Sequence, residues 1–174
     1  NNLGNLMKDL GQTDDAIKNY QKAIEINPSF AHAYNNLGNA FKDLGQLKEA
    51  VNNYEKAIEK NPDFSEAHNN LGNAYKDLGE LNSAIKCYQK AVEIDPNFAV
   101  AYYNLGTAFK RMNQREKALI LFENANSINP EMDFLLGDFR LEFAKQLLLS
   151  RCSGPSRIDS FHYNGMHRQT GYIL

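Results

Sequence analysis

A strict period of 34 residues constrains this chain more than any other feature. Asn-Pro or Asp-Pro ends each period, and the prolines Pro28, Pro62, Pro96 and Pro130 are successively 34 residues apart. Leu-Gly keeps the same interval, with its glycines at Gly4, Gly38, Gly72 and Gly106. Repeats of this length stack on their neighbours and expose a long concave surface, which binds partners more often than it carries out chemistry.

Each repeat is predicted to contain two amphipathic helices. In the second repeat, Tyr34, Leu37 and Phe41 have helical spacing, and Ala50 and Tyr54 resume it after a break. The break falls at a residue that tolerates a left-handed conformation: Gly11, Gly45, Gly79 and Asn113. The second helix should end at the Asn/Asp-Pro pair, because proline has no N–H and restricts the residue before it.

Small and large side chains alternate at fixed places, which predicts close packing between the helices. The first helix carries a glycine in every unit despite a cost of about 1 kcal/mol against alanine, so a close backbone approach is expected there. The second helix carries small residues at Ala16, Ala50, Ala84 and Ala118 and bulky ones at Tyr20, Tyr54, Tyr88 and Phe122.

With these residues, the chain resembles the tetratricopeptide repeat (TPR) family. The family pattern is met in the second unit by Tyr34, Leu37, Gly38, Phe41, Ala50, Tyr54, Ala57 and Pro62. His68 and Tyr102 stand in place of Tyr34 in the next two units. The resemblance implies an all-α solenoid of antiparallel helix pairs, wound as a right-handed superhelix that binds peptide segments along its inner groove.

Three regions are expected along the chain. Residues 1–130 would form four TPR units, with the first truncated at its N-terminus because Asn1 aligns with Asn35, inside a helix. A longer native chain is therefore expected. Residues 131–150 would form a single capping helix, and residues 151–174, which have no period, an irregular tail.

Composition excludes several classes of protein. A net charge of −2 and a pI near 6.1 argue against binding to nucleic acid or to an anionic membrane. No apolar run approaches the ~18 residues of a membrane span. Cys87 and Cys152 suggest unpaired thiols in a reducing compartment, so a cytoplasmic location is expected. No nucleophile, base and acid recur together, so we expect no enzyme, cofactor or metal.

Asparagines are concentrated on the first helix, which should line the groove. One precedes each Leu-Gly, and others lie one residue before it and directly after the glycine. The predicted peptide-binding asparagines are Asn2, Asn5, Asn35, Asn36, Asn39, Asn69, Asn70, Asn73 and Asn104. An amide offers both a donor and an acceptor to an extended backbone. The alternative for the asparagines before Leu-Gly is a structural bond to a neighbouring helix. The flanking ones are harder to explain structurally, since asparagine is a poor helix former.

The fourth unit departs from this pattern, with Tyr103 and Thr107 in place of asparagines. Tyr103 is included among the predicted binding residues. Lysines recur at the edge of the predicted groove, and Lys42 and Lys76 are included as well. Such a charged row is usually a solvated face, which is the competing interpretation.

Two resemblances within the family bear on function. Members that bind chaperone tails hold a carboxylate with cations, whereas Asn1, Asn5, Asn69 and Asn73 stand at the equivalent groove positions here. The asparagine-lined groove instead resembles the repeat portion of O-linked N-acetylglucosamine transferases, whose amides hold the substrate backbone. The favoured hypothesis is a non-enzymatic module that binds an extended protein segment, and the alternative is the substrate-recruiting arm of such an enzyme.

Self-association is the last expectation. The predicted capping helix carries a second apolar row that includes Leu141 and Leu148, and apolar patches usually mark contacts. The chain could form a homo-oligomer through this helix. Alternatively, the tail that contains Ile158 and Phe161 folds over the row and leaves a monomer.

Overall fold

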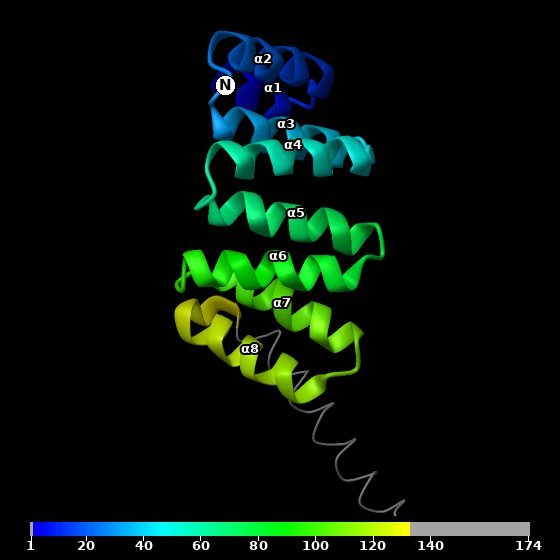
Figure 1. Cartoon of the computed structure of the whole chain (residues 1–174), viewed down its shortest axis with the longest axis vertical. Coiled ribbons are helices and arrows are strands. Elements are labelled where there is room, and N and C mark those ends of the chain that lie inside the picture. Colours follow the sequence, from blue (N-terminus) through cyan, green and yellow to red (C-terminus); the bar gives the residue numbers. More distant parts are fainter. Residues whose placement is uncertain (1, 133–174) are drawn as a thin grey trace, which may run out of the picture.

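Eight α-helices stack in chain order along the part of the protein that the structure describes, residues 2–132 of a computed structural model (Figure 1). They pair as α1 with α2, α3 with α4, α5 with α6 and α7 with α8. The helices are α1 (Asn2–Asp9), α2 (Thr13–Ile26), α3 (Ala31–Asp43), α4 (Leu47–Lys60), α5 (Ser65–Asp77), α6 (Leu81–Ile94), α7 (Ala99–Arg111) and α8 (Arg115–Ile128). A short 3₁₀ helix follows at Pro130–Met132.

The turn inside each pair is closed by a residue in the left-handed conformation. The φ angles are +74° at Gly11, +73° at Gly45, +82° at Gly79 and +59° at Asn113, so the predicted breaks are confirmed. After α3, the N–H of Gly45 donates to the carbonyl of Lys42 at 2.9 Å and that of Gln46 to Phe41 at 2.9 Å. These two bonds satisfy carbonyls that the end of the helix would otherwise leave unpaired.

The second helix of each pair ends where the Asn/Asp-Pro step predicts. Asn61, at the end of α4, is extended, with φ −143° and ψ 94°. Its side-chain Oδ1 accepts the backbone N–H of Asp63 at 3.3 Å, a local turn that asparagine favours. The chain thereby reverses and begins α5 at Ser65.

The first helices of the pairs lie on the concave side of the stack. Helix α3 contacts α5, and α5 contacts α7, across a whole repeat. No comparable contact joins α2 with α4 or α4 with α6 within residues 2–132. A stack whose first helices are closer together than its second helices curves toward the first, so α1, α3, α5 and α7 line the inner face.

An aromatic ring packs directly on the glycine of each first helix. A Cβ added to Gly38 would lie 2.7 Å from Cε1 of Tyr54, and one added to Gly72 would lie 2.6 Å from Cε1 of Tyr88. Both tyrosines are fully buried. The predicted close approach is therefore a ring against bare backbone, and any side chain at the glycine would push the two helices apart.

The remaining predictions about chain organisation fall beyond the described residues. Asn1 and residues 133–174 are outside them, which includes most of the predicted capping helix and the whole predicted tail. The first residues after Pro130 form a 3₁₀ turn, whereas in earlier units an α-helix begins three residues after the proline, as at Ala31.

Replacing Gly72 by alanine tests the ring contact, because two effects of opposite sign compete. Helix propensity alone favours alanine by about 1 kcal/mol. Overpacking against the buried Tyr88 ring should cost more, so we expect a net loss of about 1–2 kcal/mol in the free energy of unfolding by urea. The loss should shrink in a Tyr88→Leu background. A more stable Gly72→Ala protein would show that the ring moves aside at little cost.

Candidate functional site

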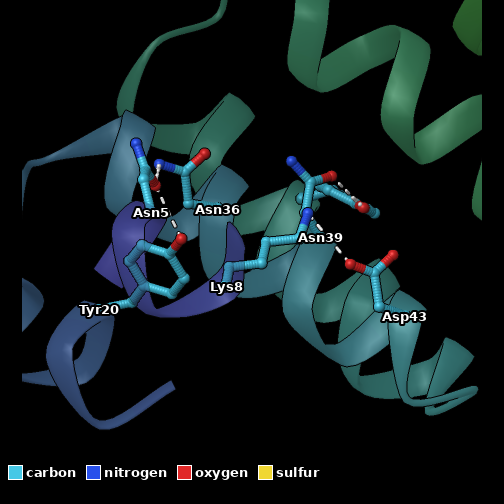
Figure 2. A network of polar contacts seen from close by, with 7 residues as sticks. Asn5, Lys8, Tyr20, Asn36, Asn39 and Asp43 are labelled. Atoms are coloured by element: carbon cyan, nitrogen blue, oxygen red, sulfur yellow. Dashed lines mark hydrogen bonds and ion pairs between the residues drawn. The ribbon is translucent and has the colours of Figure 1, made fainter. Parts of the chain in front are cut away.

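Asparagines of successive first helices bond to one another across the repeats. The Nδ2 of Asn70 on α5 donates to Oδ1 of Asn35 on α3 at 3.1 Å, and that of Asn104 on α7 donates to Asn69 on α5 at 2.8 Å. At the start of the stack, Asn36 Nδ2 donates to Oδ1 of Asn5 at 3.0 Å (Figure 2). These three bonds link six of the predicted asparagines in pairs between successive first helices, and we call this set the asparagine row: Asn5, Asn35, Asn36, Asn69, Asn70 and Asn104.

Two members of this row belong to the protein interior. The exposed fraction of Asn35 is 1%, and that of Asn69 is 4%. Asn35 accepts from Asn70 and donates its own Nδ2 to Oε1 of Glu66 at 3.1 Å, which satisfies its buried amide. For these two residues the expectation that packing does not require them is wrong. Contact with a ligand stays a prediction for the whole set.

The asparagine that follows each glycine accepts a bond from a buried tyrosine. The hydroxyl donates to Oδ1 at 2.7 Å from Tyr20 to Asn5, at 2.7 Å from Tyr54 to Asn39 and at 2.9 Å from Tyr88 to Asn73.

Sequence reasoning missed this pair, although it left a signal. In the fourth unit the aromatic residue is Phe122, which has no hydroxyl, and the acceptor position is Thr107. Donor and acceptor therefore disappear together in the same unit. That joint change marks the tyrosine and the asparagine as partners.

The hydroxyls of Tyr54 and Tyr88 stay protonated at any ordinary pH. Burial raises the pKa of Tyr54 well above its usual value, and the carboxylates of Asp43, Asp77 and Glu66 raise it further. Burial likewise raises the pKa of Tyr88, with Asp77 adding to the effect. These two hydroxyls are thus permanent donors toward Asn39 and Asn73.

Charged side chains border the asparagine row. Lys8 Nζ lies 3.0 Å from Oδ2 of Asp43, so the ion pair joins the first repeat to the second (Figure 2). Lys76 Nζ lies 3.5 Å from Oδ1 of Asn73 in its own helix. Lys42 has no ion-pair partner among residues 2–8 and 10–132, whose side chains the structure describes. Such partly exposed pairs contribute about 0–1 kcal/mol, so these lysines are not needed to hold the repeats together.

A polar pocket opens at the first step of the row. Its volume is about 280 Å³, and its lining consists of Asn5, Lys8, Tyr20, Asn36 and Asn39. Figure 2 shows Asn5 and Lys8 of α1 facing Asn36 and Asn39 of α3, with the ring of Tyr20 from α2 beneath Asn5. The pocket lining is more polar than apolar and includes amide and ammonium groups.

The other two predicted residues lie at the two ends of the row. Asn2 is exposed on α1. Tyr103 is half-buried on α7, and its ring lies against that of Phe122 with the ring centroids 5.4 Å apart.

Within residues 2–132 there is neither a cluster of metal-binding side chains nor a helix that could span a membrane. No cluster of three or more His, Cys, Asp or Glu that could hold a metal ion occurs within residues 2–132. Over the same residues, every helix is too short or too polar to cross a membrane.

Paired helices that repeat every 34 residues, with a polar concave face, define a helical-repeat scaffold. The chain belongs to the tetratricopeptide repeat family. The family description "TPR repeat" matches residues 4–45, 38–79 and 72–113, and "Tetratricopeptide repeat" matches residues 99–132. These repeats are typically non-catalytic interaction modules, and the all-α TPR solenoid expected from the sequence is confirmed.

Solved structures of MamA share this fold. One crystal structure has a TM-score of 0.69 and 30% sequence identity, and covers 75% of this chain and 76% of that one. A second has a TM-score of 0.67 and 30% identity over 75% of this chain and 71% of that one. No curated protein sequence matches the chain. Neither the family match nor these structures link it to O-linked N-acetylglucosamine transferases.

Asn35→Asp tests the buried part of the asparagine row. The new carboxylate would lie beside Glu66 in place of the donor amide, so folding should raise its pKa above the unfolded value of about 3.9. The folded state then binds the proton more tightly. Stability should therefore be lower by about 3 kcal/mol at neutral pH and recover as the pH falls through the raised pKa.

Asn52→Asp, exposed on α4, is the matched control and should show little loss at either pH. Urea denaturation at pH 7 and pH 4 measures both variants. A loss from Asn35→Asp that does not change with pH would rule out the proximity of the two carboxylates as its cause.

Proposed function

We propose that this protein binds an extended segment of a partner protein along the asparagine row of its concave face. The tetratricopeptide repeats and the likeness to MamA support a protein-interaction scaffold. The observation that carries the finer proposal is the row itself. It repeats one amide per unit on the inner face, and its bonds run between the units.

The inter-repeat bonds leave one side of the amides of Asn70 and Asn104 for a ligand. Asn70 and Asn104 use Nδ2 to reach the previous helix, and their Oδ1 atoms accept no hydrogen bond within residues 2–132. Both oxygens reach solvent, because neither is a buried side-chain atom without a bond in that range. An accessible amide oxygen accepts the N–H of an extended backbone irrespective of its side chains.

The alternative is that the same row recruits substrate segments to the catalytic part of a larger enzyme. It requires the same groove chemistry, and no contact in the described residues favours it over a free-standing module. A homo-oligomer through the predicted capping helix stays a prediction as well, since its residues lie outside the described part. The cytoplasmic location also stays a prediction.

Binding to a peptide array of unselected sequences tests the proposal. Asn70→Ala/Asn104→Ala removes two of the accessible oxygens and should weaken binding of the captured peptides about 5- to 100-fold, as expected for two lost hydrogen bonds. The matched control is Asn52→Ala/Asn124→Ala, which removes two exposed amides from the second helices α4 and α8. Equal binding by the parent and Asn70→Ala/Asn104→Ala would exclude this groove as the site.

A further inference from the structure

We propose that Asn5, Asn39 and Asn73, each with the lysine three residues further on, bind the carboxylate side chains of an acidic extended segment. We propose further that the buried tyrosines set this preference by fixing which atom of each amide faces the ligand. The inference rests on the proposed function, since it concerns the chemistry of the segment that the groove binds.

The tyrosine fixes the orientation of the amide. Tyr54 is fully buried, and its one hydroxyl proton is donated to Oδ1 of Asn39 at 2.7 Å. Turning the amide over would bring Nδ2 to the hydroxyl and leave the hydroxyl proton without an acceptor in the protein interior, which is unfavourable. The same argument holds for Tyr88, which is fully buried and donates to Asn73.

The nitrogen of each fixed amide is available to a ligand. Nδ2 of Asn39 and Nδ2 of Asn73 donate to no group within residues 2–132, and neither is a buried atom without a bond. Figure 2 shows the amide nitrogen of Asn5 turned away from the hydroxyl of Tyr20. Asn5, Asn39 and Asn73 therefore present N–H donors, which favour a ligand group that accepts hydrogen bonds.

A lysine accompanies each donor. Lys8, Lys42 and Lys76 each follow their asparagine by three residues, a spacing that places both side chains on one face of the helix. Lys76 Nζ lies 3.5 Å from Asn73 Oδ1, so the ammonium group and the amide are in contact. An amide N–H beside an ammonium suits a carboxylate better than a neutral carbonyl, because charge-assisted hydrogen bonds are the stronger kind.

Two of these lysines, Lys42 and Lys76, form no ion pair with a described carboxylate of the protein. Asp43 is engaged by Lys8, and Glu66 accepts from Asn35. Asp77 remains on α5, and it forms no ion pair within 4 Å among residues 2–132. Lys42 and Lys76 also lack a carboxylate partner among residues 2–8 and 10–132, so an incoming acidic side chain need not displace a described one.

Fluorescence anisotropy with two labelled peptides tests the inference, one alternating glutamate with alanine and the other glutamine with alanine. The parent should bind the glutamate peptide about tenfold more tightly than the glutamine peptide, as expected when a hydrogen bond gains charge. In Tyr54→Phe/Tyr88→Phe the two amides can turn over, and this ratio should fall about 3- to 10-fold. Phe122 on Gly106 shows that the fold accepts phenylalanine at this position.

Tyr75→Phe is the matched control, because it also removes a bonded hydroxyl, the one that donates to Glu55 at 3.1 Å. It should leave the ratio unchanged. Equal binding of the two peptides by the parent would overturn the carboxylate assignment. A ratio that survives in Tyr54→Phe/Tyr88→Phe, or that falls equally in Tyr75→Phe, would overturn the role of the tyrosines. If the parent bound neither peptide, the preference for acidic segments would be overturned. The proposed function is tested separately, by the peptide array.

Nuclear magnetic resonance of the parent gives a readout that does not depend on the variants folding. The side-chain amide signals of Asn39 and Asn73 should shift with the glutamate peptide and hardly at all with the glutamine peptide. Shifts confined to the second helices would contradict the proposal.

Discussion

The packing of a tyrosine ring on bare glycine backbone is the contact on which the rest of the structure depends. It sets the distance between the two helices of a pair at Gly38 and Tyr54 and again at Gly72 and Tyr88. The fourth unit keeps it with Gly106 and Phe122. Because the ring packs beside the glycine, its hydroxyl reaches the next residue of that helix, as from Tyr54 to Asn39 and from Tyr88 to Asn73. Packing and groove chemistry thus come from the same side chain.

The helical pairs and their turns could be predicted from the sequence because local residues decide them. A left-handed φ at Gly45 or Asn113 depends on the residue itself and on the end of its helix. Proline ends the second helix for an equally local reason. These residues recur in every repeat, so the prediction made for one repeat is supported by the same residues in the others.

The roles of individual asparagines could not be predicted in the same way. Asn35 and Asn36 are neighbours in the sequence and both are asparagine, yet Asn35 is buried and Asn36 is half-buried. Which of the two faces the next repeat depends on how α5 packs on α3, and this is set by contacts between units. Glu66 accepts a hydrogen bond from Asn35, but His32 and Val100 stand at the same position in the adjacent units. The repeat pattern therefore could not predict this bond.

In a groove made of identical repeats, a bound segment that shifts by one repeat contacts the same side chains, so no single register is favoured. The fourth unit removes that ambiguity in this protein. There Thr107 stands where Asn39 and Asn73 stand in earlier units, Phe122 lacks the hydroxyl, and Arg111 occupies the place of Asp43 and Asp77. The inner face therefore has two distinguishable ends, and a segment that lies along it meets a defined register and a defined direction.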